Sequence, residues 1–132
     1  MNLAQIRQWR PEVVADVADA LAARRSELLV ADEAPGAPKV AFAAELQTVI
    51  AALNVATDTI RHLVEEVEAT RDYALGHGCR VDLDTGLVTA STPAATSVRN
   101  SAIARFEHLS AEAIGADADL AAALDRAAQM RI

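Results

Sequence analysis

The most regular pattern of apolar positions lies between residues 39 and 75, a stretch without glycine or proline. Apolar residues follow one another there at alternating intervals of four and three: Phe42, Leu46, Val49, Leu53, Ala56, Ile60, Leu63 and Val67. An unbroken alternation of this kind forms the seam of a heptad repeat, along which one helix packs against another. The pattern therefore predicts one long helix over 39–75 that needs a partner helix.

A partner helix is predicted directly before it, over residues 11–32. Pro11 opens this segment, where proline is tolerated because the first turn of a helix has no partner for that N–H. The elbow at residues 33–38 has two prolines around a glycine, which ends one helix and begins the next. Because so short a connection makes two helices antiparallel neighbours, residues 11–75 are predicted to form a helical hairpin. The apolar side of the first helix is expected at Val14, Val17, Leu21 and Leu28.

Two short β-type runs follow the glycines at positions 76 and 78, and they flank the loop Asp84-Thr85-Gly86. This arrangement predicts a small β-hairpin over residues 79–90, which must pack on the helices because an isolated hairpin is only marginally stable. A third helical region is expected over 98–129, with Gly115 as a candidate break and an apolar side at Ile103, Phe106, Ala113, Leu120, Leu124 and Ala127. The predicted fold is all-α, a single helical domain over 1–132.

The predicted lengths suggest how the chain associates. At about 1.5 Å per residue, the second helix extends well beyond the first and leaves an apolar edge near Ile60, Leu63 and Val67. We expect the third helical region to cover part of this edge and a second chain to cover the remainder. The expected form is a homodimer, or else a heterodimer with another helical hairpin.

Composition narrows the class of protein. Thirty-one of the 132 residues are alanine, which favours long helices, and the net charge of −7 argues against a general nucleic-acid binder. No apolar stretch reaches the roughly 18 residues that a membrane span needs. The N-terminus lacks the charged and apolar regions of a Sec signal. We therefore expect no membrane span, and a location in the cytoplasm or export by a Sec-independent route.

Three short motifs share residues with known catalytic or metal-binding sites. Asp84-Thr85-Gly86 has the letters of an aspartic protease, but those enzymes need a nearly all-β fold, so a turn is the stronger interpretation. Asp82-x-Asp84-x-Gly86 resembles the start of a calcium loop, yet the positions of the loop's glycine and glutamate hold Leu87 and Pro93.

His77 and Cys79 form the third motif, a possible pair of metal ligands without a recognisable second pair. Cys79 also has no adjacent base in the sequence. We therefore expect no catalytic residue, no metal and no cofactor, and a protein that is not an enzyme. Trp9 has two interpretations, either an anchor packed at the start of the helix or a contact for a partner.

The opening Ile6-x-x-Trp9-x-Pro11, the alanine-rich first helix, the Pro/Gly elbow and the long second helix resemble actinobacterial proteins associated with type VII (ESX) secretion. These are relatives of the Trp-x-Gly (WxG) helical-hairpin family. The segment 78–88 is similar to a Gly-x-x-(Ile/Val)-Asp-x-x-Thr-Gly-x-Val stretch that follows the hairpin in larger members. The resemblance implies a protein–protein interaction module that acts as a secretion substrate or as an N-terminal targeting module.

Two features differ from that family. The elbow contains no Trp-x-Gly, and Tyr73, which matches the tyrosine of a Tyr-x-x-x-Asp/Glu export signal, is followed four residues later by His77. The alternative is a cytosolic structural or regulatory helical dimer unrelated to secretion. Under either hypothesis the expected contact residues are Trp9, Ile60, Leu63, Val67 and Tyr73.

Overall fold

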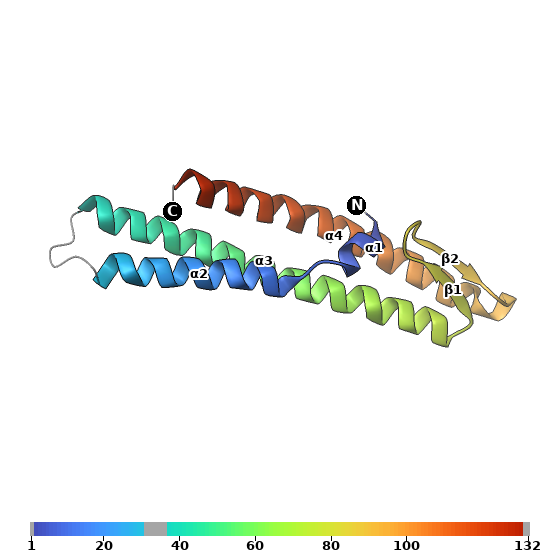
Figure 1. Cartoon of the computed structure of the whole chain (residues 1–132). Helices are drawn as coiled ribbons and strands as arrows, with labels where there is room; N and C mark the ends of the chain where they lie inside the picture. The colour runs from blue at the N-terminus through green and yellow to red at the C-terminus, as the bar shows by residue number, and fades with distance from the viewer. Residues whose placement is uncertain (1, 31–36, 131–132) are drawn as a thin grey trace. The chain divides into compact units, whose positions relative to one another are not determined.

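The computed structural model describes residues 2–30 and 37–130 (Figure 1). Its elements are α1 (Leu3–Arg7), α2 (Pro11–Val30), α3 (Ala37–Gly76), β1 (Cys79–Asp82), β2 (Leu87–Ala90), a 3₁₀ turn (Pro93–Ala95) and α4 (Thr96–Gln129). The predicted all-α architecture with one small β-hairpin is confirmed. The predicted elbow lies mostly outside the described residues, since these omit 31–36.

Local chemistry explains where several elements begin and end. The side chain of Asn2 accepts a hydrogen bond from the Gln5 amide, and the Gln5 side chain accepts one from the Asn2 amide, which together cap α1. Pro11 is the first residue of α2, as predicted. After α3, Gly78 takes a φ of 86°, a left-handed conformation that lets the chain leave the helix and enter β1.

The described chain separates into two compact units, each made of two stretches of sequence. Unit 1 comprises Met1–Trp9 and Thr59–Ala116, and unit 2 comprises Arg10–Asp58 and Asp117–Ile132. Both α3 and α4 therefore contribute one part to each unit. A single helical domain over 1–132 stays a prediction.

The core of unit 1 gathers side chains from α1, the second half of α3, the hairpin and the first half of α4. Its fully buried residues include Ile6, Leu63, Val67 and Leu109. The hairpin contributes Cys79 and Val88, one from each strand. Because these buried side chains come from four elements, the second half of α3 is covered within its own chain.

The hairpin is antiparallel, with Cys79 opposite Ala90 and Asp82 opposite Leu87. It is tied to α1 by a backbone hydrogen bond of 3.2 Å from the Ala4 amide to the Leu83 carbonyl oxygen. Figure 1 shows the two strands beside the end of α3 and the start of α4. The predicted hairpin over 79–90 is thus confirmed, including its need for support from the helices.

Unit 2 packs α2 against the first half of α3 and the last part of α4. The α2 and α3 helices run antiparallel, and α4 runs antiparallel to α3 (Figure 1). The core cluster here consists of Ala18 from α2, Val49 and Leu53 from α3, and Ala123 from α4. The buried residues that α2 and α4 contribute are both alanines, so small side chains lie where these two helices approach α3.

One predicted break is absent. α4 runs without interruption through Gly115, where the sequence suggested that the helix could end. A glycine inside a helix costs about 1 kcal/mol relative to alanine. Ala113 and Ala116 are buried on either side of it, so their packing holds the helix together at this point.

Candidate interaction surface

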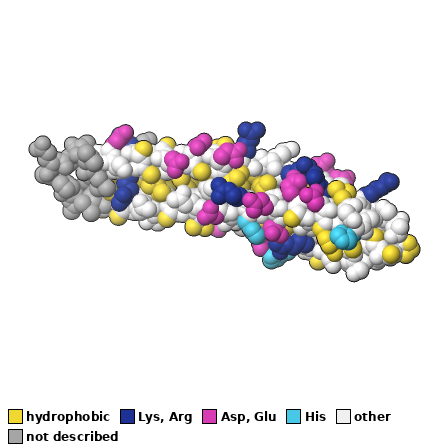
Figure 2. All heavy atoms as spheres, turned by 90° about the horizontal axis from the view of Figure 1, so that it is seen from below, with side chains coloured by type: hydrophobic (Ala, Val, Ile, Leu, Met, Phe, Trp, Pro, Cys, Tyr) yellow, Lys and Arg dark blue, Asp and Glu magenta, His cyan; other side chains and the backbone are white. Residues whose placement is uncertain are grey.

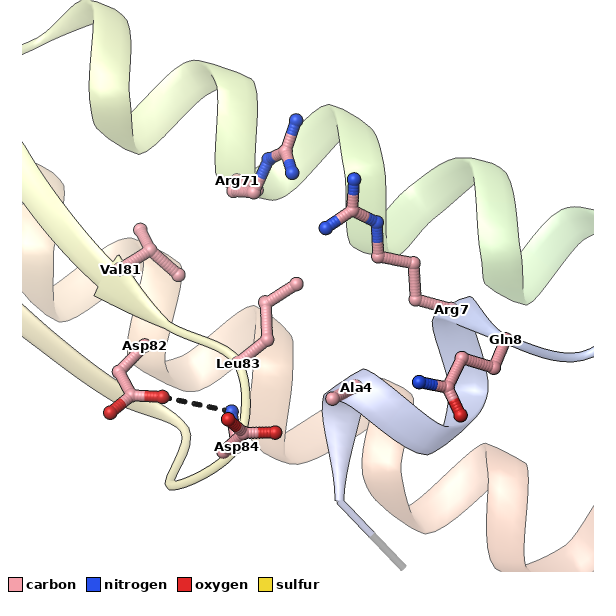
Figure 3. Close-up of a pocket in the computed structure, with 8 residues that line it drawn as sticks. All are labelled: Ala4, Arg7, Gln8, Arg71, Val81, Asp82, Leu83 and Asp84. Atoms are coloured by element: carbon pink, nitrogen blue, oxygen red, sulfur yellow. Dashed lines mark hydrogen bonds between the residues drawn. The ribbon is translucent and has the colours of Figure 1, made fainter.

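A hollow of about 530 Å³ lies between α1, α3 and the hairpin of unit 1 (Figure 3). In Figure 3 the guanidinium groups of Arg7 and Arg71 lie on one side, and the carboxylates of Asp82 and Asp84 lie on the hairpin turn. Ala4, Val81 and Leu83 provide apolar lining between the two charged sides. The arrangement offers both signs of charge around a small apolar floor.

The two arginines beside this hollow are paired with other residues of unit 1. Arg7 forms an ion pair with Glu68, and Arg71 lies 3.2 Å from the same carboxylate and 3.4 Å from that of Asp72. Arg71 Nε has no hydrogen-bond partner among the described residues, but the guanidinium charge itself is paired. Because the Arg7–Glu68 ion pair joins α1 to α3, and Arg71 on α3 pairs with the same carboxylate, we interpret the hollow as a structural junction.

The Asp84-Thr85-Gly86 loop adopts the turn that the sequence favoured over a protease site. The carboxylate that supports the turn belongs to Asp82, whose Oδ1 accepts a hydrogen bond of 3.0 Å from the Asp84 amide. Thr85 Oγ1 accepts one of 3.3 Å from the Leu87 amide, and Gly86 has a φ of 74°. Gly86 thus has the left-handed conformation that such a turn favours, and the aspartate that supports the turn is Asp82, two positions before Asp84.

The two candidate metal ligands are used in other ways. His77 is exposed, and its Nδ1 donates a 2.7 Å hydrogen bond to the Tyr73 carbonyl oxygen, one turn earlier on α3. Cys79 is buried, with Sγ 3.7 Å from the Ala95 carbonyl oxygen. Within residues 2–30 and 37–130, no three His, Cys, Asp or Glu side chains gather as a metal site.

The predicted contact residues fall into two groups. Trp9 is partly buried against the unit 1 core, in the same cluster as Leu63 and Val67, which matches its interpretation as an anchor. Tyr73 is 46% exposed on α3, and its ring centroid lies 4.5 Å from that of His77. Tyr73 is therefore the predicted contact residue that remains available at the surface.

The expected apolar edge on α3 is absent, and this corrects the sequence-based expectation. Ile60, Leu63 and Val67 are all buried in the single chain. For Leu63 and Val67 the reason is that α1, the β-hairpin and α4 together cover the second half of α3, so no second chain is needed there. These three residues hold the fold together and do not form an exposed surface.

A second hollow, of about 400 Å³, lies between α3 and α4 in unit 2. We call it the α3–α4 groove; it is lined by Thr48, Val49, Ala52, Val55, Asp119, Ala122, Ala123 and Arg126. Val55 is 66% exposed, the largest exposed fraction among the large apolar side chains in the described part of the chain. The exposed residues Ala52 and Ala122 beside it keep the groove shallow and apolar.

Charged groups lie along the α4 side of the groove. Arg126 Nε lies 3.5 Å from Glu45 Oε1 on α3, and both side chains are about half exposed. Asp119, seven residues before Arg126 on α4, is also exposed. Figure 2 shows one face of the molecule, on which apolar side chains are exposed among charged ones. The groove thus carries one positive and one negative charge along α4.

Sequence reasoning missed this groove, although a weak signal was present. Thr48, Ala52 and Val55 have the same four-and-three spacing as the predicted seam. Each stands one position before a seam residue: Val49, Leu53 and Ala56. They form a second stripe on α3 beside the seam, which the stronger pattern of leucines and isoleucines conceals. A second stripe of this kind indicates that α3 has two sides suited to helix contacts.

An interhelical ion pair in unit 1 provides a pH-dependent test. Arg105 Nη2 donates a 2.8 Å hydrogen bond to Glu66 Oε2, joining α4 to α3. This hydrogen bond is the main reason that the pKa of Glu66 lies below its usual 4.5, and the positive charges of Arg105 and His62 act in the same direction. Desolvation of the carboxylate acts in the opposite direction and raises the pKa, but it does not outweigh the hydrogen bond.

We expect the Glu66→Gln variant to lose less stability in acid than the wild type. Folding favours the ionised carboxylate because its pKa is lower in the folded state, so the stabilisation is present above pH 4.5 and is lost as the pH falls below it. The fall in Tm between pH 6 and pH 3, measured by circular dichroism, should be smaller in Glu66→Gln than in the wild type. Glu65→Gln, at the exposed neighbouring position, should fall as far as the wild type. Equal falls in the two variants would contradict this assignment.

Comparisons with protein-family models, characterised proteins and solved structures found no significant match to this chain. Of the helices that the structure describes, none combines the length and apolar character needed to span a bilayer.

Proposed function

We propose that this chain is a non-enzymatic helical protein–protein interaction module, and that the α3–α4 groove is its contact surface. The observation that carries the proposal is the 66% exposure of Val55 beside a groove of alanines in unit 2. Apolar grooves between two helices accept the apolar side of a third helix, and small side chains along the groove allow its backbone to approach closely. Covering Val55 and its apolar neighbours would then stabilise the complex.

The side chains that could take part in catalysis or metal binding all make structural contacts, which supports a role in protein binding. Asp82 supports a backbone turn, His77 bonds to its own helix, and Cys79 is buried. Each of these side chains makes a local contact that explains its presence in the fold. No nucleophile therefore needs to be assigned to account for them.

The resemblance to type VII secretion proteins suggests the setting of this interaction. Under this proposal, the chain is a secretion substrate or an N-terminal targeting module, and it forms either a homodimer or a heterodimer with another helical hairpin. Trp9 is then an internal anchor. Tyr73, which matches the tyrosine of the family's export signal, is exposed and is the residue that an export partner would contact. The alternative setting, a cytosolic structural or regulatory dimer, would use the same groove.

Photo-crosslinking tests the groove directly. A photoreactive amino acid placed at Val55 in the full chain, in its native cells, should give adducts at least several-fold more abundant than the same residue at Asn54. Asn54 is exposed on the same helix but points away from the groove, so it is a matched control.

The mass of the adduct then identifies the partner. An adduct of two identical chains or of this chain with another protein supports the interaction module. Secretion components among the adducts would favour the secretion setting over the cytosolic one. Equal yields at Val55 and Asn54 would contradict the use of the groove.

A further inference from the structure

We propose that the α3–α4 groove is filled by a second copy of this chain, with the two α4 helices antiparallel about a twofold axis between Ala122 and Ala123. This inference rests on the proposed function, because it names the occupant of the same groove. The observations behind it are the order of the charges along α4 and the small side chains between them.

The charges on α4 are self-complementary. Asp119 and Arg126 are seven residues apart, which is close to two turns, so both lie on the same side of the helix and both line the groove. The midpoint between them falls between Ala122 and Ala123. In an antiparallel pair centred there, Asp119 of each copy lies opposite Arg126 of the other. One axis thus produces two equivalent ion pairs, as a symmetric contact requires.

The side chains between the charges allow the two copies to meet. Ala122 lies beside the proposed axis and is exposed, so it presents little bulk to an approaching helix. On α3, Thr48 and Val55 are also seven residues apart, one on each side of Ala52. The same axis brings Val55 of one copy over Thr48 of the other. The most exposed valine is thereby covered.

Charge favours a second copy over an unrelated apolar helix. The chain carries a net charge of −7, which opposes the association of identical chains unless the contact itself is balanced. Within one chain Arg126 already pairs with Glu45, while Asp119 has no opposite charge beside it among the residues that line the groove. In the proposed dimer, Asp119 of each copy faces Arg126 of the other, so it gains a positive partner. A partner without a complementary positive charge would remove Asp119 from water without replacing its hydration, which is unfavourable.

Charge exchange in the full-length chain tests the arrangement. The wild type should sediment as a dimer at micromolar concentration. Asp119→Arg makes both positions positive and Arg126→Asp makes both negative, so each variant should dimerise with a Kd at least about tenfold weaker. An equimolar mixture of the two variants, and the double variant Asp119→Arg/Arg126→Asp, should both recover the dimer because opposite charges face each other again.

Asp117→Arg is the matched control. Asp117 is exposed on the same helix, about half a turn around from the groove, so the same change of charge should leave the dimer intact. Circular dichroism of each variant confirms that α-helix is retained. A mixture that stays monomeric, or single variants that dimerise like the wild type, would overturn the proposed axis.

A wild type that remains monomeric at about 100 µM would overturn the second copy as occupant. Under that result, adducts of Val55 with a different protein would still support the interaction module. The two proposals therefore fail on different measurements.

Discussion

Leu63→Ala is expected to lower the free energy of unfolding by about 2–5 kcal/mol. Leu63 is fully buried in the unit 1 core, where α1, the hairpin and α4 close over α3. Removing its isobutyl group loses the transfer free energy of those carbons and leaves a cavity, because packed helices can relax only partly. Urea unfolding followed by circular dichroism, at one protein concentration, measures the change.

Leu75→Ala is the matched control on the same helix. Leu75 is 49% exposed, so the same substitution removes carbons that already contact water. Its cost should stay below about 1 kcal/mol. If both variants lost equal stability, the second half of α3 could not be covered as the structure shows, and the expectation of an exposed apolar edge near Leu63 would return.

Ile6→Ala is the second large effect, also about 2–5 kcal/mol. The α1 helix has five residues, too few to be stable alone, so its position depends on the burial of Leu3 and Ile6 in the unit 1 core. We expect the variant to loosen α1 from the hairpin before the whole chain unfolds. The Ala4 amide, which donates to the Leu83 carbonyl oxygen, should then exchange its hydrogen about tenfold faster or more.

Ile114→Ala serves as the control for this variant. Ile114 belongs to the same unit and is 59% exposed on α4, so its truncation should cost little and leave the exchange of the Ala4 amide unchanged. Faster exchange in both variants would mean that α1 responds to general destabilisation and is not held in place by Ile6.

The heptad pattern predicted the long helix and its buried side well. Leu46, Leu53 and Leu63 are completely buried, and the whole seam faces inward apart from Phe42, which is half-buried. Such agreement is expected where large aliphatic residues repeat regularly, because the cost of exposing them fixes which side of the helix packs.

The alanine-rich helices were predicted less accurately, for a physical reason. Val17 and Leu124 were assigned to apolar sides but are exposed, while the adjacent Ala18 and Ala123 are buried in unit 2. Where helices meet closely, alanine fits the contact and a larger side chain does not. Hydrophobic periodicity ranks valine and leucine above alanine, so it misplaces these two positions. The other described residues of the predicted sides in unit 2 do pack against the core: Val14, Leu21, Leu120 and Ala127.

The proposed contact surface could not be predicted from the sequence because the groove depends on which helices lie side by side. Periodicity gave the length of α3 and the presence of a third helical region, but not the coverage of Leu63 and Val67 by that region together with α1 and the hairpin. The predicted exposed edge was therefore placed on the wrong half of α3. The groove beside Val55 depends on the neighbouring residues Asp119 and Arg126, which are more than sixty positions away in the sequence.

Each unit is built from two stretches that lie far apart in the sequence, so its core can be completed only late in synthesis. Ile6 leaves the ribosome long before Phe106, although the two belong to one core cluster. At about 5–20 residues per second, the first of them waits roughly 5–20 s for the second. Ala18 waits similarly for Ala123 in unit 2. Although α2 can already pack on the first half of α3, a growing chain exposes the seam on the second half until α4 emerges. During that interval it presents this apolar stretch to chaperones or to another nascent copy.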